Sequence, residues 1–251
     1  MNMFGLNGKV AIVTGAATGL GQGMAIALAE AGADIVSVGL GDQSETAQKI
    51  AAAGRKFLAI DADLFSTEPI QGVVDQVVAE FGHVDILVNN AGIIRRADAV
   101  DFTEKDWDDV MNINVKTVFF FCQAVAKQFI KQGTGGKIIN IASMLSFQGG
   151  IRVPSYTASK SGIMGITRLM ANEWAKHNIN VNAIAPGYMA TANTAPLRAD
   201  EDRSAEILSR IPAGRWGTPA DLGGPVVFLS APASDYVSGY TIAVDGGWLA
   251  R

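Results

Sequence analysis

The sequence has one cysteine and two histidines, and these shortages exclude two kinds of chemistry. Cys122 cannot form an internal disulfide, and the apolar residues before it are typical of a thiol that fills the core. His83 and His177 do not combine with it at the spacing of a zinc site, so we expect no catalytic metal. A chain without disulfides also fits the reducing cytoplasm.

Positive charge and long apolar runs are scarce as well. Lys and Arg number 20 against 24 Asp and Glu, which gives the 251-residue chain a formal net charge of -4. No basic run exceeds a pair such as Arg95-Arg96, so we expect no nucleic-acid partner. No stretch approaches the ~18 apolar residues that span a bilayer, and the first residues lack the pattern of a signal peptide. We therefore expect a cytoplasmic protein with no membrane partner.

Short apolar, β-branched runs are plentiful, and helix-length amphipathic segments separate them. This alternation predicts an α/β fold, a single-domain Rossmann-type doubly wound parallel sheet with helices on both faces. We assign residues 1–251 to one dinucleotide-binding and catalytic domain, in which residues 188–219 form a substrate lid. The predicted strands are Lys9–Thr14, Asp34–Val38, Phe57–Ile60, Asp85–Asn89, Lys137–Ala142, Asn180–Ile184 and Thr241–Val244.

A glycine-rich turn follows the first predicted strand. Gly15, Gly19 and Gly21 precede the helical pattern Met24–Ala31, which lets a pyrophosphate approach the backbone at a helix N-terminus. Turns of this kind also occur in purely structural roles. The spacing here, however, resembles the TGxxxGxG of the short-chain dehydrogenase/reductase family.

The resemblance extends along the whole chain. Residues 89–92 match the family's NNAG, and Pro186-Gly187 followed by Thr191 matches its PGxxxT. The residues at the family's catalytic positions are Asn114, Ser143, Tyr156 and Lys160. The resemblance implies an enzyme that moves a hydride between a nicotinamide cofactor and an alcohol or ketone.

The cofactor contacts follow from the same resemblance. Gly39 stands where the family usually has an acidic residue for the adenosine ribose, and Asp42 is the nearest carboxylate. No Lys or Arg lies between Lys9 and Lys49 to neutralise a 2′-phosphate, so we favour NAD over NADP. Asp63 matches the adenine-contacting position, although a solvated strand-end carboxylate would look the same. The expected cofactor-binding residues are Gly15, Thr18, Gly19, Leu20, Gly21, Asp42, Asp63, Leu64, Asn90, Ala91, Gly92, Tyr156, Lys160, Pro186, Gly187, Met189 and Thr191.

The catalytic residues have a physical logic of their own. Tyr156 and Lys160 are spaced i, i+4 and share one face of the helix predicted to begin near Ser155. A free tyrosine has a pKa near ~10, and a nearby ammonium favours its phenolate. By resemblance, Tyr156 exchanges the alcohol proton, Ser143 binds the carbonyl oxygen and Asn114 holds a water of the proton relay. Each has a structural alternative, namely a surface helix pair, a strand-end cap and a solvated mid-helix amide.

Substrate choice depends on loops rather than on the fold. Residues 92–97, 143–154, 211–217 and 235–251 resemble one branch of the family, the 2-dehydro-3-deoxy-D-gluconate 5-dehydrogenases. Enzymes of that branch act in uronate breakdown of the pectin or alginate type. They interconvert this acid and a 2,5-diketo acid with NAD.

An acidic substrate requires a cation in the pocket, and a guanidinium binds a carboxylate best. Arg152 is our first choice, ahead of Arg95 or Arg96 after the NNAG and Arg215 in the predicted lid. A surface or interface role is the alternative for each arginine. The expected substrate-binding residues are Arg152, Arg95, Gln148, Tyr188 and Arg215.

Other functions share this set of residues. Gluconate 5-dehydrogenases have the same four catalytic residues and act on a related sugar acid. A 3-oxoacyl carrier-protein reductase would use NADP and a basic docking patch, which the acidic balance of the chain disfavours. A non-catalytic nucleotide-binding protein would be expected to lack one of the four residues.

The apolar C-terminal run Val237–Leu249 bears on assembly. It includes Tyr240 and Trp248, more aromatic surface than a solvated tail carries. The family resemblance implies a homotetramer, and the alternative is that the run covers its own core.

Overall fold

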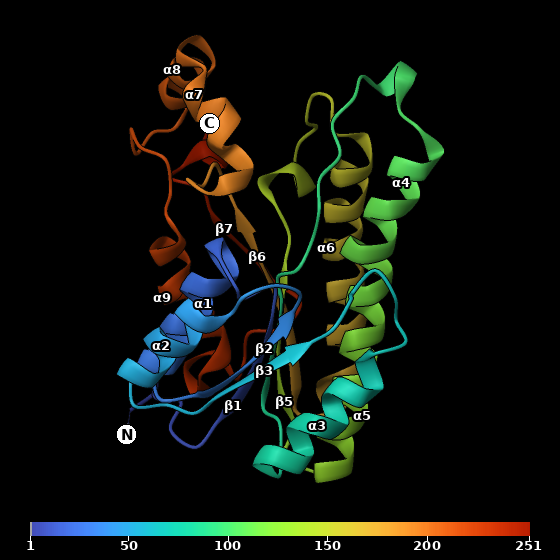
Figure 1. Cartoon of the computed structure of the whole chain (residues 1–251), viewed down its shortest axis with the longest axis vertical. Coiled ribbons are helices and arrows are strands. Elements are labelled where there is room, and N and C mark those ends of the chain that lie inside the picture. Colours follow the sequence, from blue (N-terminus) through green and yellow to red (C-terminus); the bar gives the residue numbers. More distant parts are fainter. Residues whose placement is uncertain (1) are drawn as a thin grey trace.

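A seven-stranded parallel sheet organises the computed structural model, which describes residues 2–251 (Figure 1). The strand order is β3-β2-β1-β4-β5-β6-β7, so the direction of winding reverses between β1 and β4. This arrangement confirms the predicted doubly wound sheet, and each predicted strand end lies within two residues of the observed one. The strands are β1 Val10–Thr14, β2 Asp34–Gly39, β3 Phe57–Asp61, β4 Ile86–Asn89, β5 Gly136–Ile141, β6 Ile179–Pro186 and β7 Thr241–Val244.

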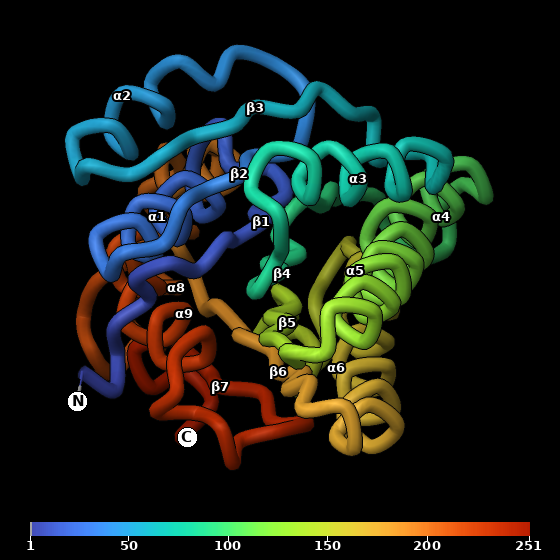
Figure 2. The backbone as a smooth tube through the Cα atoms, turned by 90° about the horizontal axis from the view of Figure 1, so that it is seen from below, coloured from blue at the N-terminus to red at the C-terminus, as the bar shows by residue number. Residues whose placement is uncertain are grey.

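Helices cover both faces of the sheet, as the continuous Val/Ile character of the strands predicts. Figure 2 shows α1, α2 and α9 on one side and α3, α5 and α6 on the other. The helices are α1 Gly19–Glu30, α2 Ser44–Ala52, α3 Ile70–Phe81, α4 Glu104–Met111, α5 Val118–Gln132, α6 Pro154–Trp174, α7 Ala195–Ala199, α8 Glu201–Arg210 and α9 Gly223–Ser230. No helix in this part of the chain combines the length and apolar character needed to cross a membrane.

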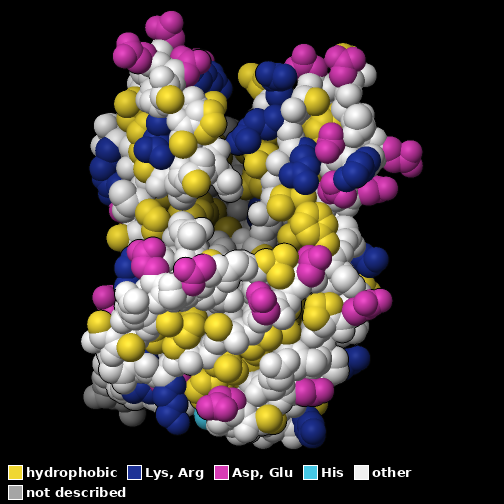
Figure 3. Space-filling view, in the orientation of Figure 1, with side chains coloured by type: hydrophobic (Ala, Val, Ile, Leu, Met, Phe, Trp, Pro, Cys, Tyr) yellow, Lys and Arg dark blue, Asp and Glu magenta, His cyan; other side chains and the backbone are white. Residues whose placement is uncertain are grey.

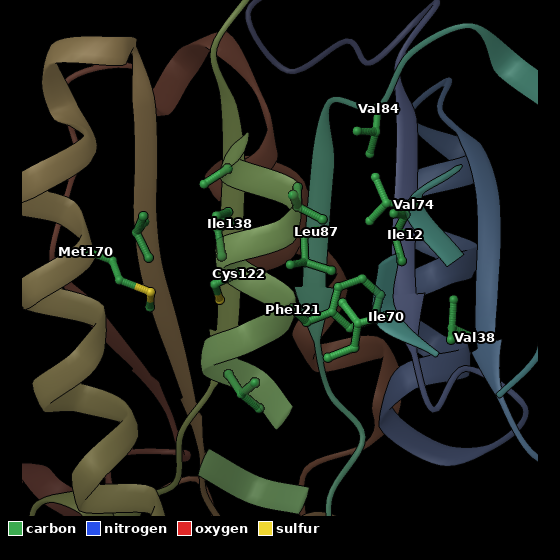
Figure 4. Packing of buried hydrophobic residues seen from close by; sticks show 14 of the residues in the cluster. Ile12, Val38, Ile70, Val74, Val84, Leu87, Phe121, Cys122, Ile138 and Met170 are labelled. Atoms are coloured by element: carbon green, nitrogen blue, oxygen red, sulfur yellow. The ribbon is translucent and has the colours of Figure 1, made fainter. Parts of the chain in front are cut away.

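The core is divided by the sheet into two apolar layers. In β1, Val10 and Ile12 belong to the layer under α3, α5 and α6, whereas Ala11 and Val13 belong to the layer under α1 and α9. This alternation is the two-residue period of a strand buried on both faces. Figure 4 shows Ile12 in the first layer together with Phe121 of α5. The rigid double layer fixes the strand ends that carry the site.

Cys122 lies in this core, as its apolar surroundings predict. Its Sγ accepts a hydrogen bond from Asn89 Nδ2 at 3.1 Å, and the side chain is fully buried. Burial raises the pKa of the thiol to about 12, so it stays protonated and unreactive. The interpretation of Cys122 as a core residue is confirmed.

Beyond the carboxyl end of β6, the chain forms α7 and α8 above the sheet (Figure 1). These helices rest on a small apolar cluster that contains Ile207, Ile211 and Trp248. The Trp248 ring lies 4.9 Å from that of Tyr188 and beneath the Arg210 guanidinium at 4.1 Å. The C-terminal residues therefore support the segment predicted to be the lid.

Candidate active site

A cleft of about 1030 Å³ opens at the carboxyl ends of the strands, where ligands of open α/β sheets bind. Figure 3 shows it as a deep groove between two raised parts of the surface, with basic side chains along its upper part. The predicted cofactor residues line it, except Gly21 and Asp42. Ser143 and Tyr188 also line it, so one cavity unites residues far apart in the sequence.

The glycine-rich turn forms one end of the cleft. Gly15 has φ +66° and Gly19 has φ +59°, a region that side chains disfavour. A Cβ at Gly21 would lie 2.2 Å from the Gly15 oxygen and 2.5 Å from Asn90 Nδ2, so no larger residue fits. The turn leads directly into α1, and the first residues of that helix, Gly19 and Leu20, line the cleft. This cradle fits the pyrophosphate of a dinucleotide.

The NNAG segment is tied to this turn by partly buried hydrogen bonds. Thr14 Oγ1 accepts from the backbone N–H of Asn90 at 3.0 Å and of Ala91 at 2.9 Å. Asn90 Nδ2 donates to the Thr14 and Gly15 carbonyl oxygens at 3.0 and 3.2 Å. Because these bonds join the ends of β1 and β4, the floor of the cleft is held at the point where the sheet winding reverses.

The end of β2 differs from expectation at one position. Gly39 and Leu40 line the cleft, and Leu40 is 62% exposed. Asp42 does not line it, since its carboxylate accepts hydrogen bonds from the Ser44 backbone and hydroxyl at 2.9 Å. This geometry therefore does not support the prediction that Asp42 takes the role of the acidic residue that is missing at Gly39. Asp63, by contrast, lines the cleft as predicted.

Tyr156 and Lys160 face the cleft from α6. Lys160 Nζ lies 5.6 Å from the centre of the Tyr156 ring and donates to the Ile141 carbonyl at 2.6 Å. Only 5% of Lys160 is exposed, and burial lowers the pKa of its ammonium to about 8. The alternative of a surface helix pair is therefore wrong. A buried cation beside a phenol is a suitable device for stabilising phenolate.

Three influences act on the Tyr156 phenol. Burial raises its pKa, while a hydrogen bond from Ser143 and the positive charge of Arg96 lower it. Ser143 Oγ also accepts from the Leu145 backbone N–H at 3.1 Å, the capping role given as its alternative. The Leu145 bond uses a lone pair of the Ser143 oxygen and not its proton, which can be donated to the Tyr156 phenol or to a substrate oxygen, so capping and catalysis are compatible.

Asn114 lies in a π-helical turn, Asn112–Thr117, between α4 and α5. Its side chain is 1% exposed and makes two bonds with the Ile93 backbone, accepting from N–H and donating to C=O, both at 2.9 Å. It also donates to Ser159 Oγ at 3.2 Å. The alternative of a solvated mid-helix amide is therefore wrong, because Asn114 joins the cleft wall to α6. Such π-turns are frequent at functional sites.

The predicted substrate arginines are placed very differently. Arg95 lies outside the cleft lining and pairs with Asp106 and Asp109 at 3.5 and 3.7 Å. Arg215 is also outside and bonds both carboxylate oxygens of Asp221 at 2.7 and 2.8 Å. The structure thus does not bring these two predicted residues to the site, because acidic neighbours hold them elsewhere.

Two of the other substrate predictions reach the cleft. Arg152 and Tyr188 line it, whereas Gln148 does not. Arg152 has φ +63°, and its Nε is 2.9 Å from Asp98 Oδ1, with both side chains more than half exposed. A surface ion pair of this kind contributes little stability but compensates the guanidinium charge.

Sequence reasoning did not distinguish Arg96 from its neighbour and missed Arg203 altogether, although both line the cleft. Arg203 pairs with Glu206 one turn along α8. The helical period of α8 predicts that pair but gives no sign that one face borders a cavity. Within residues 2–251, no three His, Cys, Asp or Glu side chains are grouped as a metal site.

Comparison with known proteins agrees with this geometry. Residues 15–249 match the family model described as enoyl-(acyl carrier protein) reductase. The chain is 72% identical to the 2-dehydro-3-deoxy-D-gluconate 5-dehydrogenase of Escherichia coli K12, covering 100% of this chain and 99% of that one. It is 53% identical to the Bacillus subtilis enzyme of the same name, at 99% and 97% coverage.

Solved structures are similar over the whole length. One from Agrobacterium tumefaciens, solved with bound NADP, has a TM-score of 0.94 and 55% identity, with 100% of both chains covered. A gluconate 5-dehydrogenase from Burkholderia cenocepacia in complex with NADP and tartrate has a TM-score of 0.94 and 37% identity, covering 100% of this chain and 98% of that one. The fold of the whole chain is thus shared with these solved structures.

Proposed function

This chain belongs to the short-chain dehydrogenase/reductase family, and on that premise we propose that it is an NAD-dependent 2-dehydro-3-deoxy-D-gluconate 5-dehydrogenase. Family membership itself makes it an oxidoreductase with a nicotinamide dinucleotide cofactor. The observation that supports this choice of substrate is the full-length sequence identity to relatives of that name. The proposed reaction interconverts this sugar acid and its 2,5-diketo acid during uronate breakdown.

The protein's task in this reaction is to orient the substrate and to manage one proton. When bound, the cofactor supplies the hydride donor or acceptor. We assign Tyr156 as the group that takes the proton of the substrate hydroxyl in oxidation and returns it in reduction. The ammonium of Lys160 favours the phenolate, and the hydroxyl proton of Ser143, which its bond with Leu145 does not use, stabilises charge on the substrate oxygen. Asn114 holds the cleft wall against α6 and, in this proposal, positions the water that relays the proton.

The preference for NAD rests on charge. The basic side chains that line the cleft are Arg96, Arg152, Lys160 and Arg203. None belongs to the β2–α2 turn, where Gly39 and Leu40 form the wall. A 2′-phosphate there would lose hydration without gaining a cation. The NADP found in solved relatives makes the cofactor assay a direct test.

The proposed assembly is a homotetramer in the cytoplasm. Trp248 is buried in its own chain, so part of the C-terminal run covers its own core. Tyr236, Tyr240 and Trp107 stay 104%, 63% and 41% exposed, which leaves large aromatic surface for neighbouring subunits. Sedimentation equilibrium of the purified protein tests this assembly, and a monomer at micromolar concentration would contradict it.

The decisive experiment follows NAD and NADP reduction by absorbance with 2-dehydro-3-deoxy-D-gluconate and D-gluconate offered in parallel. We expect turnover of the first acid with NAD. Preference for gluconate would move the assignment to the gluconate 5-dehydrogenases, to one of which the chain is 42% identical. Binding of NADH without turnover of either acid would favour a non-catalytic protein.

A further inference from the structure

A single hydroxyl group outside the four catalytic residues is bonded to the backbone of two of them. Ser146 Oγ donates to the Lys160 carbonyl oxygen at 2.6 Å and accepts from the Ser143 backbone N–H at 3.3 Å. The first bond reaches the interior of α6, and the second closes the short 3₁₀ turn Met144–Ser146, which Ser143 caps. Ser146 thus connects the turn that positions Ser143 to the helix that carries Tyr156 and Lys160.

The position of Ser143 depends on this turn because the sheet no longer holds it. β5 ends at Ile141. The backbone N–H of Ala142 still donates to the Ile184 carbonyl of β6 at 2.8 Å, but the next N–H, that of Ser143, donates to Ser146 Oγ. A shift of the turn would therefore move the Ser143 hydroxyl while β5 stays in place.

The bond from Ser146 to α6 is additional to the bonds that the helix makes for itself. The Lys160 carbonyl lies inside α6, where backbone groups bond to one another, and a carbonyl oxygen has a second lone pair for another donor. The effect of the Ser146 bond is therefore to fix the turn against α6. The side chain of the same lysine fixes α6 to the end of β5, since its Nζ donates to the Ile141 carbonyl at 2.6 Å.

The alignment of the turn with α6 matters for the proton carrier. A hydrogen bond from Ser143 lowers the pKa of the Tyr156 phenol, because it stabilises the phenolate. The charged groups that face this phenol are the Lys160 ammonium, 5.6 Å from the ring centre, and the Arg96 guanidinium. Within residues 2–251, no hydrogen bond joins Ser146 Oγ to either charge. A change at Ser146 therefore acts on the phenol through the position of Ser143.

We propose that Ser146 is a positioning residue for the reaction, which holds the Ser143 hydroxyl in line with the Tyr156 phenol by joining the turn to α6. This inference rests on the proposed function and deepens it, since it adds a residue that controls the geometry of proton transfer. The structural alternative is a hydroxyl that only stabilises the turn. The two roles differ measurably, because loss of stability alone lowers activity without changing the pKa of Tyr156.

The test compares Ser146→Ala with Ser234→Ala. The Ser234 hydroxyl also donates to backbone carbonyl groups, those of Leu229 and Ala231 at 3.1 and 3.0 Å, but the residue lies outside the cleft lining. In Ser146→Ala, loss of one hydrogen bond should raise the apparent pKa of kcat for oxidation of the sugar acid by up to about one unit. This shift should lower kcat up to about tenfold below that pKa and leave it unchanged above. Ser234→Ala should keep the wild-type profile, although its Tm falls.

A second pair of variants isolates the hydroxyl even if the alanine variant folds poorly. Ser146→Thr keeps the hydroxyl, and Ser146→Val replaces it with a methyl group of similar size. We expect the shifted profile in Ser146→Val but not in Ser146→Thr. A loss of kcat that is equal at every pH, an unchanged profile in Ser146→Ala, or the same profile in the Thr and Val variants would overturn the proposal.

A spectroscopic titration does not depend on which acid is the substrate. The chain has four tyrosines, so carbon NMR of protein labelled at tyrosine Cζ can be assigned from the signal that Tyr156→Phe lacks. The Tyr156 signal should titrate at higher pH in Ser146→Ala than in the wild type. If this shift occurs but the wild type fails to oxidise 2-dehydro-3-deoxy-D-gluconate, the proposed substrate is wrong and the role of Ser146 stands. Coincident Tyr156 titrations in the two proteins would reject that role.

Discussion

The two ends of the cleft are built from different kinds of chemical group. At the cofactor end, backbone groups and small residues are packed so tightly that a Cβ at Gly21 would lie 2.2 Å from the Gly15 oxygen. At the substrate end, long side chains that are exposed (Arg152) or partly exposed (Arg203) pair with acidic partners. Steric fit therefore controls the first end, and the balance of paired and unpaired charge controls the second.

This difference explains why one end accepts a single residue type and the other tolerates variation. A tight turn around a pyrophosphate leaves no room for alternatives, so its glycines recur as a motif. An ion pair on the surface can be rebuilt from many positions at little cost in stability. Substitutions at the two ends should therefore differ in the size and in the kind of their effects on activity, binding and stability.

The largest expected effect comes from the point where the ends meet. Tyr156→Phe removes the proton carrier and should lower kcat by about 10²–10⁴-fold, because only proton transfer is lost. NADH affinity, measured by fluorescence titration, should change little. Tyr236→Phe, which alters a fully exposed tyrosine, is the control. An active Tyr156→Phe protein would remove Tyr156 from this role.

An added methyl group at the cofactor end should have the next largest effect. In Gly21→Ala the new methyl group pushes the Gly15 carbonyl and the Asn90 amide away from it, which should lower the free energy of unfolding by about 1–3 kcal/mol. We expect weaker NADH binding and a lower Tm. Gly72→Ala, on α3 with no atom within 4 Å of its added Cβ, should leave both unchanged or raise Tm slightly. Wild-type affinity in Gly21→Ala would contradict the steric account.

The pH dependence of the free energy of unfolding should show how much the buried charge of Lys160 destabilises the protein. Burial lowers the pKa of Lys160 from the ordinary lysine value of 10.5 to about 8 in the folded protein. The unfolded chain therefore binds more protons between these two values, and the free energy of unfolding rises with pH there. Lys160→Met avoids this cost. Its stability advantage over the wild type in urea should be largest below about pH 8 and shrink by about 1–3 kcal/mol towards about pH 10. Parallel pH curves for the two proteins would refute the assignment.

The smallest effect concerns the cofactor's far end. Leu40→Arg places a guanidinium on the wall that lacks a cation, and it should raise the NADP to NAD ratio of kcat/KM about tenfold, or about 1.4 kcal/mol. Leu169→Arg, at a 48% exposed position on α6 outside the cleft lining, should leave the ratio unchanged. Equal ratios in both variants would show that the 2′-phosphate does not contact this wall.

The same contrast decides how much the sequence could predict. The strands, the glycine turn and the residues of the catalytic centre are recognisable because burial and steric fit restrict them to few residue types. Arg95 and Arg96 are adjacent and chemically identical, yet one turns to Asp106 and the other into the cleft. Arg215 likewise pairs with Asp221 only because the intervening turn brings them together. Such pairings depend on three-dimensional contacts that no local pattern encodes.

The last residues of the chain have a practical consequence for anyone preparing the enzyme. Trp248 is buried beneath α8, and Arg251 Nη2 donates to the Ser209 carbonyl at 2.7 Å. Residues 2–9, which precede β1, lie at the opposite end of the molecule (Figure 1). A purification tag fused after Arg251 would therefore push against the helix beside the substrate cleft, whereas a tag at the other terminus leaves that helix undisturbed.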